Sequence, residues 1–189
     1  TTLVPNLGVV SLGMERSFVM ADVPGLIEGA SEGAGLGFRF LKHLSRTRLL
    51  LHLVDVLPAD NSNPIDSAKQ IASELKKFSP SLAAKERWIV LNKVDLLDEK
   101  EVNILEAALR AELGWKKPIY KISAINQGGC DDLCQQLMES IESHRQKIID
   151  DGPDMTMRGT DMKQSEPRYF STRWFFNNVD STGGGYGGI

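Results

Sequence analysis

Two apolar runs constrain the fold of this 189-residue chain more than any other feature. The runs LLLHLVDV at 49–56 and WIVLN at 88–92 are almost continuous, which is typical of strands buried on both faces of a parallel sheet. Each run is followed by a helix pattern, at 63–78 with Pro64 near its start and at 98–114 with Gly114 at its end. This alternation predicts an α/β fold with a doubly wound, mostly parallel sheet.

The remaining segments extend this pattern and then leave it. We expect short strands at 9–12 and 17–21, a helix at 37–50, a strand at 118–125 and a last amphipathic helix at 129–149. Beyond 149 the chain is polar, then dense in aromatic residues at 169–176, then rich in glycine. We therefore expect one domain over 1–149 and a largely flexible tail over 150–189. The aromatic cluster could dock on the domain, dock on a partner or have no function.

Composition excludes several classes of protein. The net charge of −3 argues against nucleic-acid binding through bulk positive charge, and no apolar run is long enough to span a membrane. Cys130 and Cys134 lie four residues apart in a helix pattern, which suits neither a disulfide framework nor a metal site. A reducing cytoplasm fits this cysteine usage.

The firmest chemical signal is the motif Asn92-Lys93-Val94-Asp95, which ends the second apolar run. It falls at the carboxyl edge of the predicted sheet, where doubly wound folds bind ligands. Asp95 can accept two hydrogen bonds from guanine, which adenine cannot donate, and such a pair rejects the wrong base by roughly 10⁴-fold. Asn92 can bond the other edge of the base, and the Lys93 stem can lie along the ring. A chance match at a polar strand end, and an ATPase that Asp95 disfavours, are the alternatives.

Two further motifs stand at the ends of predicted strands. Downstream, Ser123-Ala124 follows a strand, and the Ala124 N–H can meet the guanine O6. Upstream, a strand ends in Asp22-Val23-Pro24-Gly25, where the aspartate can hold Mg²⁺ through water and the Gly25 N–H can reach a γ-phosphate. Pro-Gly alone is only a turn signal. The order of the three motifs, all at strand ends, argues against coincidence.

With these motifs in place, the sequence resembles the translation-factor-type GTPases, and within them the Obg family. The resemblance covers 1–149 and rests on TTLVPNLGVV, DVPGLIEGASEGAGLGFRFLKHLSRTRLLLHLVD, NKVDLL and SA. It implies a P-loop NTPase-type fold and hydrolysis of GTP to GDP with Mg²⁺. It also implies a cytoplasmic, monomeric switch that acts with the RNA and protein of the large ribosomal subunit during its assembly, linked to growth and stress. A non-enzymatic module that docks on a ribosome or protein partner is the alternative.

The resemblance also implies the site residues. Thr2 would bind Mg²⁺ directly when GTP is present, and Asp22 would bind it through water. The implied nucleotide contacts are Thr1, Thr2, Leu3, Val4, Asp22, Val23, Pro24, Gly25, Asn92, Lys93, Val94, Asp95, Ser123, Ala124 and Ile125.

The glycine-rich stretch at 25–37 is interpreted as a loop that moves. Glycine recurs there at every fourth position, so the loop has little intrinsic order and contact with a γ-phosphate can select one shape. Leu26 stands where many small GTPases carry a water-orienting glutamine. Slow intrinsic hydrolysis is expected, and the catalytic group is unknown, with Glu28 suggested by proximity alone.

The chain contains no G-x-x-x-x-G-K-[ST] phosphate-binding loop. We therefore expect it to be the carboxyl-terminal part of a longer GTPase that binds nucleotide poorly alone. In this fold, the strand before that loop is central, between the strands at 17–21 and 49–56. Its absence predicts an empty slot about 4.8 Å wide with two unpaired edges.

Overall fold

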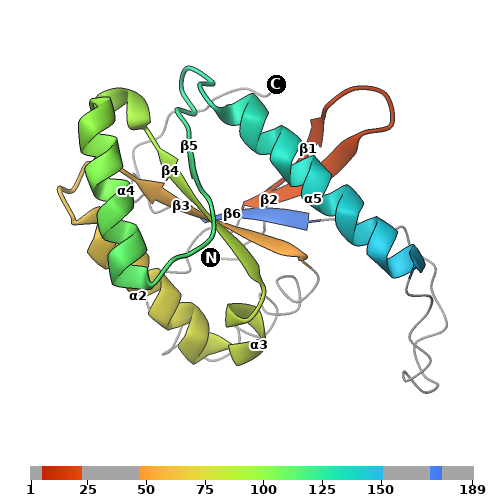
Figure 1. Ribbon diagram of the computed structural model, residues 1–189, viewed down its shortest axis with the longest axis horizontal. Coiled ribbons are helices and arrows are strands. Elements are labelled where there is room, and N and C mark those ends of the chain that lie inside the picture. Colours follow the sequence, from red (N-terminus) through yellow and green to blue (C-terminus); the bar gives the residue numbers. More distant parts are fainter. Residues whose placement is uncertain (1–5, 23–46, 151–170, 176–189) are drawn as a thin grey trace.

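The computed structural model describes residues 6–22, 47–150 and 171–175. The described strands form one six-stranded sheet with the order β1-β2-β6-β3-β4-β5 (Figure 1). The hairpin of β1 and β2 is antiparallel, whereas the pairs β2–β6, β6–β3, β3–β4 and β4–β5 are parallel. The strands are β1 (Asn6–Ser11), β2 (Ser17–Asp22), β3 (Leu49–Asp55), β4 (Glu86–Asn92), β5 (Ile119–Lys121) and β6 (Ser171–Phe175).

The main helices begin and end where local chemistry allows. Asn63 caps α2 (Pro64–Phe78), since its Oδ1 accepts the Ile65 N–H at 2.8 Å. A capping box between Asp98 and Glu101 opens α4 (Glu99–Leu113), and Gly114 closes it with φ of 60°. The remaining helical segments are α3 (Pro80–Ala83), the 3-10 turn η1 (Val94–Leu96) and α5 (Cys130–Asp150).

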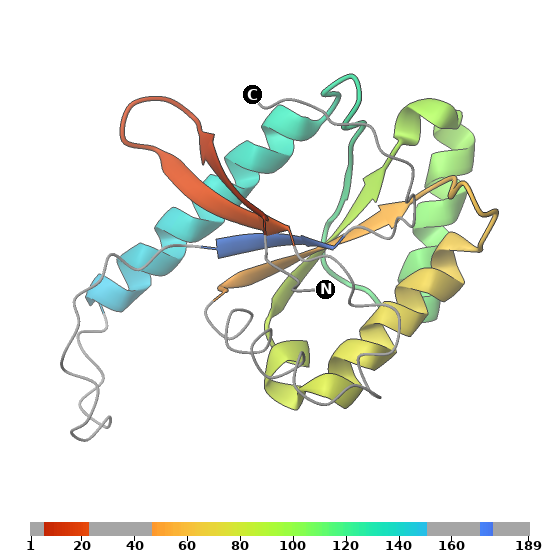
Figure 2. The same cartoon turned by 180° about the vertical axis from the view of Figure 1, so that it is seen from behind.

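Helices cover both faces of the sheet, and an apolar cluster lies between the sheet and the helices on each face. Figures 1 and 2 show α2 and α4 together on one side and α5 on the other. The α5 side buries Leu51, Trp88, Leu137 and other residues, and the α2–α4 side buries residues that include Ile89 and Leu109. The predicted parallel, doubly wound α/β architecture is confirmed.

His52 is a buried polar residue within this core. It is fully inaccessible on β3, and neither ring nitrogen has a hydrogen-bonding partner in the part of the chain that the structure describes. Burial, reinforced by the charge of Arg87 on β4, lowers the pKa of His52 to about 3. The imidazole is therefore neutral at physiological pH.

The structure corrects two expectations. A helix was expected at 37–50, but its last two residues, Leu49 and Leu50, belong to β3. Residues 37–46 of that segment lie outside the described residues. The slot between β2 and β3 is not empty, because β6, from the aromatic cluster at 169–176, occupies it. The β6 backbone pairs with Ala21 and Leu50 through Arg173. The unpaired edges predicted for β2 and β3 are therefore absent along Val19–Asp22 and Leu49–His52.

Candidate functional site

The carboxyl ends of β3 and β4 lie side by side and form the base of the candidate site. Asp55 and Asn92 are register partners, and the Val56 N–H donates to the Asn92 carbonyl at 3.1 Å. Both residues end long apolar runs, so the side chains that follow emerge together at one edge of the sheet. This is the edge at which parallel α/β sheets hold their ligands.

Asn92 joins two of the loops that the sequence singled out. Its side chain is buried, and its Oδ1 accepts the backbone N–H of Ala124 at 3.1 Å. A second link runs from the Val94 N–H to the Ile122 carbonyl at 3.2 Å. The loop after β4 and the loop after β5 are thereby fastened together. The Ala124 N–H, expected to meet a guanine O6, is engaged by Asn92 in this structure, so a base would have to share or replace that bond.

Lys93 is held by a residue that sequence reasoning missed. Its backbone is left-handed, with φ of 66° and ψ of 31°, and its Nζ lies 2.6 Å from Asp55 Oδ2. The Asp55 side chain is only 9% exposed, and its other oxygen accepts the Leu57 N–H at 3.0 Å. The signal in the sequence was the position of Asp55 at the end of the first apolar run. This ion pair anchors the ammonium group of Lys93 beside the end of β3.

Asp95 and Ser123 carry side-chain oxygens that have no hydrogen-bonding partner among the described residues. Asp95 lies in η1 and is exposed, and no described residue hydrogen-bonds to its carboxylate. The Ser123 Oγ is buried and also lacks a hydrogen-bonding partner. Beside it, the Ile125 side chain is 88% exposed. The exposed carboxylate of Asp95 and the exposed apolar side chain of Ile125 can contact a flat, hydrogen-bonding base, whereas the buried Ser123 hydroxyl is not accessible to one.

The loop after β5 depends on Gly129, which the sequence analysis did not single out, and has a second close approach at Gly128. Gly129 has φ of +71°, and a Cβ there would lie 2.3 Å from the Lys121 carbonyl oxygen. A Cβ on Gly128 would lie 2.9 Å from Asn126 Oδ1. The tight turn brings the Gly128 carbonyl to 2.8 Å from the Ser123 N–H, so the loop that carries Ser123 is closed on itself.

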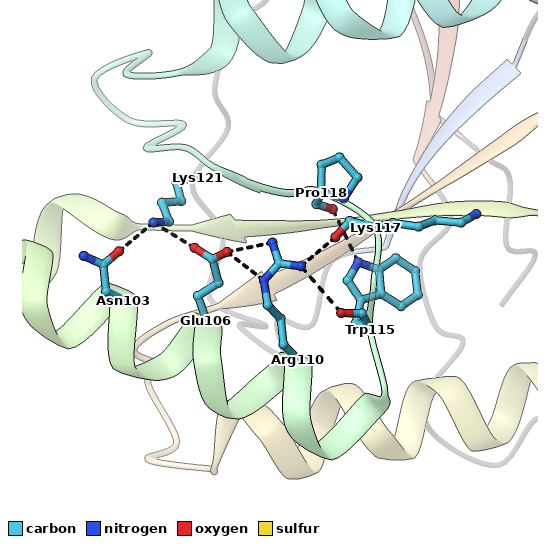
Figure 3. Close-up of polar contacts among 7 residues, drawn as sticks. All are labelled: Asn103, Glu106, Arg110, Trp115, Lys117, Pro118 and Lys121. Atoms are coloured by element: carbon cyan, nitrogen blue, oxygen red, sulfur yellow. Dashed lines mark hydrogen bonds and ion pairs between the residues drawn. The ribbon is translucent and has the colours of Figure 1, made fainter.

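A charged network ties β5 to α4 and so fixes the start of this loop (Figure 3). Glu106 of α4 accepts from Arg110 and from Lys121 Nζ, each at 2.8 Å. Arg110 also donates to the Lys117 carbonyl at 2.8 Å, and Lys121 donates to Asn103 at 2.8 Å. Burial alone would raise the pKa of Glu106, but these hydrogen bonds and charges outweigh it and lower the pKa. Helix α4 thus holds the strand that presents Ser123.

The phosphate and metal half of the predicted site is not assembled from described side chains. Asp22 ends β2, and only its backbone is described, beside Trp174 of β6. The remaining predicted residues at this end, Thr1, Thr2, Leu3, Val4, Val23, Pro24 and Gly25, lie outside the described residues, as do Leu26 and Glu28. Among the described side chains, no group of three or more acidic, histidine or cysteine residues could hold a metal ion. The Mg²⁺ ligands stay a prediction.

Two further expectations concern the cysteines and membranes. Cys130 and Cys134 are free thiols, and burial raises the pKa of each. The Cys130 thiol lies 3.9 Å from the Ser123 carbonyl, to which it donates. Of the helices in the described part of the chain, none has the length and apolar character needed to cross a bilayer.

Comparisons with known proteins show which proteins this chain resembles. Residues 1–93 match the model of a family described as 50S ribosome-binding GTPase. A point mutant of Era from Aquifex aeolicus, bound to GDP·AlF4−, is 20% identical with a TM-score of 0.53, and the likeness covers 73% of this chain but 44% of the Era chain. A putative nucleolar GTP-binding protein 1 from Plasmodium falciparum is 18% identical with a TM-score of 0.44, over 77% of this chain and 78% of its own. The Era likeness shows a P-loop NTPase-type fold. The family match, over residues 1–93, indicates a GTP-binding domain.

Proposed function

We propose that this chain is part of an Obg-type GTPase that binds GTP and GDP through the edge formed by β3, β4 and β5. The observation that carries the proposal is the hydrogen bond between Asn92 and Ala124, which holds the two base-reading loops together. The matched family supports the assignment to GTPases. The finer assignment to Obg rests on the sequence resemblance.

The proposed base recognition follows from the free groups at this edge. Asp95 accepts from the guanine N1–H and exocyclic amine, because its carboxylate has no partner among the described residues. Lys93, anchored by Asp55, supplies its alkyl stem to the ring face. Adenine would leave the carboxylate unpaired, which is costly where water is displaced.

The proposed reaction is hydrolysis of GTP to GDP. Thr2 and Asp22 would hold Mg²⁺, which supplies charge stabilisation to the phosphates when it is bound. Gly25 would present its N–H to the γ-phosphate, and the glycine-rich stretch after it would respond to the nucleotide state. The proposed setting is a cytoplasmic switch in large ribosomal subunit assembly, which rests on the sequence resemblance. The description of the matched family, 50S ribosome-binding GTPase, supports a contact with that subunit.

Base selectivity can be tested without requiring tight binding. Amide resonances of an isotope-labelled chain are followed by NMR during titration with GDP or ADP to millimolar concentration in the presence of Mg²⁺. GDP should shift the signals of Asp95 and Ala124, and ADP should leave them in place.

A pair of variants sharpens this test. Asp95→Asn should abolish the GDP response and create one to xanthosine diphosphate, since the amide donates where the carboxylate accepted. Asp132→Asn, at an exposed acid of α5, is the matched control and should behave as wild type. Equal responses to GDP and ADP, or none in either loop, would refute the guanine site.

A further inference from the structure

Lys93 begins the loop after β4 in a backbone conformation that lysine rarely adopts. Its φ of 66° and ψ of 31° lie in the left-handed region, and the other described non-glycine residues with positive φ are Glu15, Asn61 and Gln127. The Cβ of lysine crowds the backbone there, and lysine lacks the short polar side chain with which asparagine stabilises this conformation locally. A contact with another part of the fold must therefore hold the Lys93 backbone.

Asp55 supplies that contact from a fixed position at the end of β3. Its Oδ2 lies 2.6 Å from Lys93 Nζ, and its Oδ1 accepts the Leu57 N–H at 3.0 Å. Its backbone is the register partner of Asn92 on the adjacent strand β4 (Figure 1). The Asp55 side chain is 9% exposed whereas that of Lys93 is 37% exposed, so the carboxylate is the fixed member of the pair.

The conformation of Lys93 determines where Asp95 lies. Lys93 immediately precedes η1, and its carbonyl accepts the Leu96 N–H at 3.0 Å. The Val94 N–H donates to the Ile122 carbonyl at 3.2 Å, which fastens the same turn to the end of β5. A right-handed Lys93 backbone would turn η1 away from this arrangement, and the Asp95 carboxylate would move with it.

The charge of Asp55 acts in the opposite direction on an anionic nucleotide. An unpaired carboxylate at this edge would repel the phosphates of GDP. Asp55 is paired, however, because the Lys93 ammonium group lies 2.6 Å away and neutralises its charge. We therefore expect the loss of the anchor to outweigh the relief of repulsion when this carboxylate is removed. The two effects differ in sign, so an experiment can separate them.

We propose that Asp55 is a positioning residue for base recognition, which acts by holding Lys93, and through it Asp95, in the conformation that accepts guanine. This inference rests on the proposed function. If the loop without its anchor adopts the accepting conformation about a tenth of the time, the apparent dissociation constant for GDP rises about tenfold.

The test compares Asp55→Asn with the wild type by NMR in the presence of Mg²⁺. Asparagine keeps an oxygen for the Leu57 N–H but lacks the charge that pairs with Lys93. The initial slope of the Asp95 amide shift against GDP concentration should fall by about tenfold, which can be measured without saturating the site. Without nucleotide, hydrogen exchange of the Val94 amide should become faster, because the turn is no longer held in one conformation.

Two further variants make the test specific. Asp60→Asn is the matched control, because Asp60 is exposed and makes the same turn, through the Ser62 N–H at 3.0 Å, and this variant should behave as the wild type. Lys93→Met keeps the apolar stem and removes the ammonium group. In that background the additional Asp55→Asn change should alter the GDP slope and the exchange rate by less than about twofold.

The outcomes separate this inference from the proposed function. Equal losses of slope in both backgrounds, an unchanged or steeper slope in Asp55→Asn, or unchanged exchange at Val94 would overturn the positioning role of Asp55. A wild type that responds equally to GDP and ADP, or to neither, would refute the guanine site instead. Exchange at Val94 in the nucleotide-free chain would then still decide whether Asp55 orders the loop.

Discussion

The buried His52 makes a quantitative prediction about acid stability. The imidazole has a pKa of about 3 in the folded protein against 6.5 in the unfolded chain, so below pH 6.5 the unfolded state binds the extra proton. The free energy of unfolding is therefore unaffected by His52 above pH 6.5. It decreases by about 1.4 kcal/mol per pH unit as the pH falls from 6.5 towards 3. At pH 5 this single residue should have cost about 2 kcal/mol.

The assay is urea unfolding of the wild type and of His52→Leu between pH 7 and pH 5. Leucine fills a similar volume and has no nitrogen to protonate or leave unpaired, so the variant should be at least as stable at pH 7. The wild type should then lose about 2 kcal/mol more than the variant on going to pH 5. His144→Gln removes an exposed histidine and is the matched control, which should follow the wild type. Parallel curves for wild type and His52→Leu would refute the burial argument.

Two further substitutions test the loop that presents Ser123. Gly129→Ala should destabilise the protein by at least about 2 kcal/mol in thermal unfolding, because φ of +71° and the 2.3 Å approach to the Lys121 carbonyl leave no room for a Cβ. Gly8→Ala, where nothing lies within 4 Å, should be near neutral, and an equal loss at both glycines would contradict this reading. Glu106→Gln should cost about 1–2 kcal/mol at pH 7 through its lost charge-assisted hydrogen bonds. The difference in stability between the wild type and Glu106→Gln should decrease below pH 4.5, because the lowered pKa of Glu106 contributes stability that is lost when the carboxylate is protonated. Glu112→Gln, at an exposed ion pair with Lys69, is its control, and a similar loss there would count against the network of Figure 3.

Much of the candidate site could be predicted from sequence because its residues follow strand ends. Asn92 is the last residue of β4 and Ser123 stands two residues after β5. Parallel strands bring their carboxyl ends to one edge of the sheet, so the proximity of these residues follows from the fold. Asp55 was missed, although it obeys the same rule, because no motif drew attention to it. The link from Asn92 to the Ala124 N–H could not be foreseen, since it depends on the side-chain direction within a tight loop.

The sequence by itself determined the layers of this protein. Continuous apolar runs specify strands buried on both faces, and the amphipathic period of the segments between them specifies the covering helices. Only the tertiary structure decided the order of the strands. Strand pairing depends on which backbone edges are available across the whole fold. The local sequence of Ser171–Phe175 does not specify which strands lie beside it. For the same reason, patterns placed this segment in a tail, whereas the available edges of β2 and β3 place it at the centre of the sheet.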